Sequence, residues 1–203
     1  MTRSVASLLF PGVEELDFVG PWEIFGSLQS SQPDACAVFT VSEHGGEVRC
    51  ARGLQVLAQH SFATAPHADL LVVPGGRGID TEVDNPSVIA YVRQVAAAAE
   101  VTTSVCTGAF LLERAGLLDG KQVTTHWTSL DGLRALGTVE VVAGRRWIDA
   151  GSIVTAAGVS AGIDMALYLV GRLWGPEVAR RVQKDVEYFP DPPYADVPIP
   201  AKA

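Results

Sequence analysis

One short apolar run constrains the fold of this chain more than any other feature. Residues 68–74 read Ala-Asp-Leu-Leu-Val-Val-Pro, and consecutive apolar side chains of this kind predict a strand that is buried on both faces. A sheet with both faces buried needs helices on each side, as in doubly wound α/β folds. The rest of the chain alternates between predicted strands and helices. We therefore expect an α/β fold: a doubly wound, mostly parallel sheet with helices on both faces.

The expected elements follow from apolar periodicity and from Gly, Pro and Asn punctuation. Strands are predicted at residues 5–10, 36–42, 68–74, 101–105, 122–125, 139–142, 147–149 and 152–156, with a small hairpin at 47–50 and 54–59. Helices are predicted to begin near Pro21 and at Pro86, Thr107, Thr128, Val159 and Pro176. We expect one domain over residues 1–189, because this length supports a single large core, and a Pro-rich tail over residues 190–203.

Charge and hydropathy exclude several classes of partner. The chain has 203 residues, a net charge of −8 and a pI near 4.9. Phosphate contacts need clustered Lys and Arg, so we expect no nucleic-acid partner. No apolar run is long enough to span a membrane, and the apolar stretch near the N-terminus is too short for a secretion signal. We therefore expect a cytoplasmic protein without a membrane partner.

The cysteines and glycines do not indicate a metal or an organic cofactor. Cys36, Cys50 and Cys106 form an odd set without close spacing, which favours neither a disulfide framework nor a zinc site. The glycine-rich loop at residues 75–78 lacks the full spacing of a dinucleotide-binding loop and does not follow the first strand. We expect no metal site and no cofactor.

Cys106 lies at the junction between a predicted strand, Val101–Val105, and a predicted helix. The pattern Ser104-x-Cys106-x-Gly108 places small residues on both sides, as in a nucleophile elbow, where a sharp strand-to-helix turn exposes one side chain. The positive end of the following helix would favour the thiolate, the nucleophilic form of cysteine. The alternative is a buried cysteine that fills the end of the strand.

Other polar groups are expected beside Cys106, because ligands of doubly wound sheets bind at the carboxyl ends of the strands. Asp17 follows the first strand and could transfer protons, or it could be an exposed helix N-cap. Gly75 and Gly76 follow the strand at residues 68–74, and their N–H groups could stabilise a developing negative charge. Because these groups and Cys106 all follow the carboxyl ends of strands, they are expected to lie together, and this predicts Cys106 as a nucleophile.

Two further side chains are candidates for the same site. Thr107 carries a hydroxyl and a backbone N–H at the start of a predicted helix, and either could face a substrate. His126 follows the end of a predicted strand, where it either borders the site or packs in the interior.

Taken together, these residues resemble the ThiJ/PfpI superfamily of flavodoxin-like proteins, over roughly residues 5–189. The matching stretches are Leu8–Pro11, Leu16-Asp17, Gly20-Pro21, Pro74–Gly76, Thr103–Gly108, Ala115–Leu118, Thr124–Trp127 and Ala161–Asp164. The resemblance implies Cys106 as nucleophile, Asp17 as general acid/base and Thr107 as a positioning residue. It also implies a homodimer and a small-molecule substrate.

Within that superfamily the chain is similar to two branches with different functions. The isocyanide hydratases imply addition of water to an isocyanide, through a thioimidate on Cys106, to give an N-substituted formamide. Those enzymes tend to carry Gly-Gly-Gly-Ile-Thr-Ala-Gly where this chain has Ala-Ala-Gly-Val-Ser-Ala-Gly at residues 156–162, a segment expected near the cysteine. The sensory domains of AraC-type transcription regulators imply ligand binding without turnover.

Overall fold

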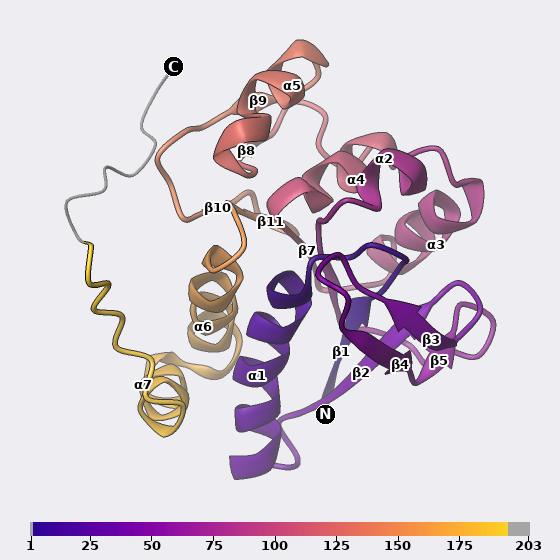
Figure 1. Cartoon of the computed structure of the whole chain (residues 1–203). Coiled ribbons are helices and arrows are strands. Elements are labelled where there is room, and N and C mark those ends of the chain that lie inside the picture. The colour runs from indigo at the N-terminus through magenta and orange to yellow at the C-terminus, as the bar shows by residue number, and fades with distance from the viewer. Residues whose placement is uncertain (1, 195–203) are drawn as a thin grey trace.

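A seven-stranded sheet forms the centre of the molecule in the computed structural model, which describes residues 2–194 (Figure 1). The strand order is β10-β11-β7-β6-β1-β2-β5. Every neighbouring pair is parallel except β10 and β11. The strands span β1 (Arg3–Leu8), β2 (Cys36–Ser42), β5 (His60–Ser61), β6 (Leu70–Val73), β7 (Val101–Val105), β10 (Trp147–Asp149) and β11 (Ile153–Ala156). The predicted doubly wound, mostly parallel α/β fold is confirmed.

Helices cover both faces of this sheet, as the apolar strands require. The helices span α1 (Glu15–Ser31), α2 (Ile79–Glu82), α3 (Pro86–Ala96), α4 (Ala109–Arg114), α5 (Leu130–Ala135), α6 (Ala161–Trp174) and α7 (Pro176–Asp185). Figure 1 shows α1, α6 and α7 on one side and α2, α3 and α4 on the other. Leu70 and Val72 pack with the first group, whereas Leu71 and Val73 pack with the second. This alternation along β6 follows from the two-residue period of a strand.

Two small sheets lie outside the central one. β3 (Gly46–Arg49) and β4 (Gln55–Ala58) form the predicted hairpin. β8 (Gln122–Val123) pairs in parallel with β9 (Glu140–Val141). The prediction of a longer strand over residues 122–125 was therefore wrong in length. Thr124 and Thr125 are buried in the loop after β8 rather than paired in a strand.

The first helix begins earlier than the sequence predicts, and this changes the setting of Asp17. α1 starts at Glu15, and Pro21 lies inside it rather than at its start. Proline has no N–H, so the Asp17 carbonyl lacks the partner that residue 21 would normally supply. The prediction failed because proline is usually an N-terminal signal in helices, whereas tertiary packing tolerates it here. Residues 195–203 of the expected tail lie outside the described residues.

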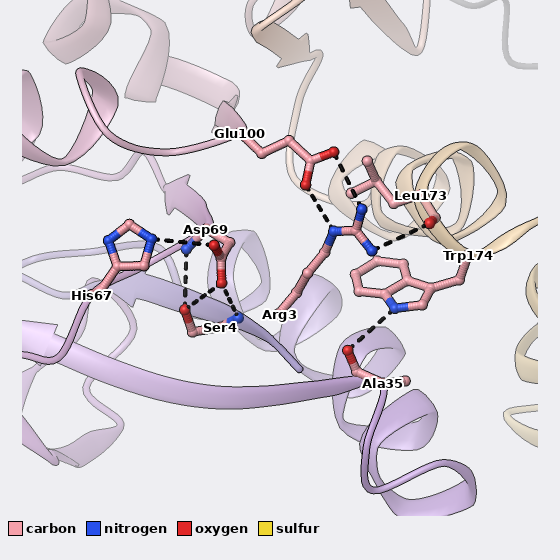
Figure 2. A network of polar contacts seen from close by, with 8 residues as sticks. All are labelled: Arg3, Ser4, Ala35, His67, Asp69, Glu100, Leu173 and Trp174. Atoms are coloured by element: carbon pink, nitrogen blue, oxygen red, sulfur yellow. Dashed lines mark hydrogen bonds and ion pairs between the residues drawn. The ribbon is translucent and has the colours of Figure 1, made fainter. Parts of the chain in front are cut away.

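A polar network joins the amino ends of neighbouring strands (Figure 2). Cys106 follows the carboxyl end of β7, so this network lies at the other end of the parallel strands. Asp69 accepts hydrogen bonds from the Ser4 N–H at 2.7 Å and from the Ser4 hydroxyl at 2.8 Å. His67 Nε2 lies 3.2 Å from the same carboxylate. These contacts tie the start of β1 to the residue before β6.

Figure 2 also shows how the end of α6 is attached to this edge. The Arg3 guanidinium donates to Glu100 at 2.7 Å and lies 5.1 Å from the ring centre of Trp174. The Trp174 indole N–H donates to the carbonyl of Ala35 at 3.2 Å. Cation–π contacts of this kind contribute roughly 0.5–1 kcal/mol at exposed sites. The last turn of α6 is thus joined to both β1 and the loop before β2.

Within residues 2–194, no helix combines the length and the apolar character that a membrane crossing requires.

We predict that Asp69→Asn lowers the free energy of unfolding by about 1–2 kcal/mol at pH 7, because a hydrogen bond to a charged carboxylate stabilises the fold more than one to a neutral amide. Partial burial raises the pKa of Asp69, but the hydrogen bonds from Ser4 and His67 outweigh burial and hold the pKa below its ordinary value. A carboxyl group whose pKa is lowered by folding stabilises the fold at pH values above its unfolded-state pKa. This contribution is lost as the pH falls through the folded-state pKa.

The difference between wild type and Asp69→Asn should therefore shrink below about pH 4, as measured by urea unfolding at several pH values. The exposed Asp119 makes no side-chain hydrogen bond with any described residue, so Asp119→Asn is the matched control. A pH-independent difference for Asp69→Asn would contradict the assignment.

Candidate active site

Cys106 has a left-handed backbone conformation, with φ at +57°. Such values are uncommon outside glycine, and the strain is of order 1–3 kcal/mol. Cys106 follows β7 directly and opens the short 3-10 helix η1 (Cys106–Gly108), which continues into α4. This is the strand-to-helix turn that the sequence predicts, although the single helix predicted from Thr107 is divided into η1 and α4.

Neighbouring chain segments hold this strained turn in place. The Cys106 N–H donates to the Ala157 carbonyl at 2.9 Å, and the Cys106 carbonyl accepts from the Thr125 hydroxyl at 2.7 Å. At Gly108 a Cβ would lie 2.8 Å from the Pro74 carbonyl oxygen and still closer to that of Val73. Only glycine fits at this point, which explains the small residue two positions after the cysteine.

Asp17 is completely buried and faces the same turn. Its Oδ2 accepts a hydrogen bond from the Gly75 N–H at 2.8 Å. Burial raises the pKa of Asp17 to about 7, against the lowering effect of the Gly75 N–H. The charge of Glu14 raises this pKa further, whereas a weak hydrogen bond from the Cys106 thiol lowers it. The N-cap position of α1 is Glu14, so Asp17 is not the exposed cap that was the alternative interpretation.

The glycine loop positions other site residues instead of presenting free donors. The Gly75 N–H is bound to Asp17, and the Gly76 N–H donates to the Thr107 hydroxyl oxygen at 3.1 Å. Our expectation that these two N–H groups face a developing negative charge therefore differs from the structure, because both already have partners. Together they fix Asp17 and Thr107 on either side of Cys106.

The electrostatic surroundings of Cys106 overturn the expectation of a stable thiolate. Burial, and secondly the charge of Asp17, raise the pKa of the Cys106 thiol to about 12. The backbone N–H groups of Thr107 and Val159 and the Thr107 hydroxyl lower it, but by less. The short helix that follows does not compensate for desolvation. At neutral pH the thiol keeps its proton, so a base is needed to make it a nucleophile.

Val159 is a site residue that the sequence did not single out. Its φ is +36°, again left-handed for a non-glycine residue, and its backbone N–H lowers the pKa of the Cys106 thiol. The available signal was the departure from the hydratase pattern at residues 156–160, which we expected near the cysteine. The hydrogen bond between Cys106 and Ala157 confirms that placement.

A pocket of about 320 Å³ opens beside this centre. It is lined by Thr124, Thr125, His126, Trp127, Leu130, Gly144, Arg145, Arg146, Ala157, Gly158, Val159 and Ser160. Two of these residues, Thr125 and Ala157, form hydrogen bonds with the Cys106 backbone. The wall of the pocket therefore adjoins the backbone of the cysteine elbow, although Cys106 is not itself a lining residue.

His126 borders this pocket rather than the acid/base pair. Its Nδ1 accepts from the Thr128 N–H at 3.3 Å, which leaves Nε2 to carry the proton of the neutral ring. Burial lowers the pKa of His126. The ring lies against Gly158, where a Cβ would be 3.0 Å from Nε2. In the described part of the chain, no group of three or more His, Cys, Asp or Glu side chains is arranged to hold a metal ion.

Fold and site together define a cysteine-elbow protein of the DJ-1/PfpI class, and the sequence profile of the DJ-1/PfpI family matches residues 3–172. The chain belongs to this family. It is 38% identical to the isonitrile hydratase of Pseudomonas putida, over 96% of this chain and 82% of that enzyme.

Two other proteins, one of them of known structure, are similar to this chain. The crystal structure of a ThiJ/PfpI family protein from Pseudomonas syringae superposes with a TM-score of 0.89, at 31% identity, over 99% of this chain and 81% of that one. The HTH-type transcriptional regulator CdhR of Pseudomonas aeruginosa is 27% identical over 91% of this chain, which corresponds to 54% of the regulator. The expected homodimer stays a prediction.

We predict that Gly75→Ala disrupts the site while leaving the fold intact. A Cβ at this position would lie 2.6 Å from the Thr107 backbone nitrogen and 3.0 Å from Asp17 Oδ2, so the Thr107 backbone and the Asp17 side chain would both have to shift. Spectroscopic titration should show a shifted pKa for the Cys106 thiol. Gly26→Ala is the matched control, because nothing lies within 4 Å of its Cβ position, and helical Ala is favoured over Gly by up to roughly 1 kcal/mol. Identical thiol titrations in the two variants would contradict the proposed role of Gly75.

We also predict that Asp17→Asn lowers the pKa of the Cys106 thiol, because it removes the negative charge that helps to raise it. The rate of alkylation of Cys106 by iodoacetamide, followed by mass spectrometry across pH, should reach half-maximum at a lower pH in the variant. The pKa values of Cys36 and Cys50, raised to about 11 mainly by burial, should not change. An unchanged or higher midpoint at Cys106 would contradict the coupling.

Proposed function

We propose that this protein adds water to an isocyanide and releases an N-substituted formamide. The observation that carries the proposal is the buried pair of Cys106, whose thiol is protonated, and Asp17, whose pKa is raised to about 7. A base with a pKa near the working pH can both accept and return a proton. The similarity to the Pseudomonas putida isonitrile hydratase supports the same reaction.

The first step joins the thiol to the substrate. The Asp17 carboxylate accepts the proton from Cys106 as Sγ attacks the terminal carbon of the isocyanide. Asp17 then delivers that proton to the same carbon, which gives a thioimidate, R–N=CH–S–Cys106. The N–H groups of Thr107 and Val159, which both lower the pKa of the thiol, stabilise the negative charge on sulfur during this transfer.

The second step hydrolyses the thioimidate. Asp17, again a carboxylate, accepts a proton from water as the hydroxyl oxygen adds to the carbon, and delivers that proton to the nitrogen. The tetrahedral adduct R–NH–CH(OH)–S–Cys106 then collapses to R–NH–CHO: the C–S bond breaks, Asp17 accepts the hydroxyl proton and passes it to the departing sulfur, which restores the thiol and the carboxylate. Splitting one addition into two easier steps is the advantage of covalent catalysis.

A ligand-sensing role without turnover is the second candidate. The similarity to the regulator CdhR over 91% of this chain favours it. A sensor would use the same pocket but would not need the acid/base pair. Release of formamide in catalytic amounts separates the two functions, since a sensor would bind an isocyanide and leave it unchanged.

We predict that Asp17→Asn lowers kcat for a simple isocyanide by roughly 10²–10⁴-fold, and that Cys106→Ala abolishes turnover. In the wild type kcat/KM should rise with pH through about 7, because Asp17 must be ionised to accept the thiol proton. The measurement is formamide release across pH.

The thermal midpoint of each variant is the control for folding. Burial of a charged carboxylate disfavours the folded state at pH values above its unfolded-state pKa. The midpoint of Asp17→Asn at pH 8 should therefore equal or exceed that of the wild type. Near-normal turnover by Asp17→Asn would refute the mechanism.

A further inference from the structure

We propose that the pocket beside Cys106 selects isocyanides whose substituent has an apolar body and an anionic end, bound by Arg145. This inference rests on the proposed function, because it concerns the substrate of the same site. The pocket adjoins the cysteine elbow through Thr125 and Ala157, which line the pocket and form hydrogen bonds with the Cys106 backbone. A linear isocyanide attacked at its terminal carbon can therefore extend its substituent into this space.

The walls and size of the pocket suit a small ring. Leu130, Ala157 and Val159 supply aliphatic surface, and Trp127 adds an indole that is 57% exposed. Apolar walls with a few polar groups are typical of small-molecule sites, and a volume of about 320 Å³ is at the lower end of their usual range. An occupant of this kind would cover Trp127, one of the largest exposed apolar side chains among the described residues.

The charged side chains that line the pocket are Arg145 and Arg146. No Asp or Glu is among its lining residues, although the chain as a whole has 23 acidic and 15 basic side chains. The guanidinium of Arg146 is matched, since it pairs with Asp164 and donates to the Ser160 hydroxyl at 3.2 Å.

Unlike Arg146, Arg145 has no ion-pair partner among the described residues. It is exposed at the pocket and makes no ion pair or side-chain hydrogen bond with any described residue. Its planar guanidinium presents a fork of donors that fits a carboxylate with two parallel hydrogen bonds. The neutral ring of His126 adds an Nε2–H to the same lining. The geometry therefore favours a carboxylate at the end of the substituent that lies away from Cys106.

The first test compares two substrates that differ only in this group, 4-isocyanobenzoate and isocyanobenzene. The wild type should show a kcat/KM roughly three- to tenfold higher for the carboxylate, the range expected for one partly exposed charge-assisted contact. Arg145→Gln should remove this preference, so that kcat/KM for 4-isocyanobenzoate falls to the level of kcat/KM for isocyanobenzene in the same variant. Arg181→Gln is the matched control, because Arg181 is exposed on α7 and also lacks an ion pair among the described residues.

A second measurement does not depend on turnover. Calorimetric titration of Cys106→Ala with the two product formamides, 4-formamidobenzoate and formanilide, should give tighter binding of the carboxylate by a similar factor. Adding Arg145→Gln should abolish the difference. Selective binding without turnover of either isocyanide would refute the proposed hydratase function and retain the anion preference of the pocket. Equal binding of the two formamides, or a preference that persists in Arg145→Gln, would overturn the inference.

Discussion

The left-handed backbone of Cys106 is the constraint on which the rest of the site depends. A non-glycine residue adopts this conformation only where its surroundings compensate for the strain. Here the compensation comes from Ala157, directly after β11, and from Thr125 in the loop after β8, through their hydrogen bonds with the Cys106 backbone. The parallel register supports the same arrangement, because Ser104 pairs with Val73 and Val105 pairs with Ala156. The carboxyl ends of three adjacent strands therefore meet at the cysteine.

That arrangement also decides the proton chemistry. Burial of Asp17 and Cys106 side by side disfavours the charged form of each, so the pKa of both groups is raised. Two such groups in contact hold a proton more readily than either would in water. The backbone N–H groups around them act selectively: that of Gly75 binds the carboxylate, whereas those of Thr107 and Val159 face the thiol. The pair is thus suited to proton transfer from sulfur to oxygen and back, rather than to a permanent thiolate.

The strand-to-helix turn at Cys106 was predictable because its signals are local. Five residues of buried strand, Val101–Val105, end where small side chains permit a tight turn, and the structure has the strand at these same residues. The hairpin at β3 and β4 and the Asn85 cap of α3, which accepts from the Ser87 N–H at 3.0 Å, are local in the same way. Each depends on neighbours a few residues away in the chain, and short-range steric and hydrogen-bond preferences determine it.

The start of α1, the burial of Asp17 and the pKa of Cys106 were not predictable in this way. Each depends on groups more than 50 residues away: the Gly75 N–H that binds Asp17, and the Val159 N–H beside the thiol. By itself, the sequence determined the alternation of strands and helices, the cysteine at the elbow and the polar residues at the strand ends. Tertiary structure alone decided which of these residues touch, how deeply they are buried and where the protons reside. The physical reason is that desolvation and hydrogen bonding at a buried site are set by distant segments packed around it, which local sequence preferences do not encode.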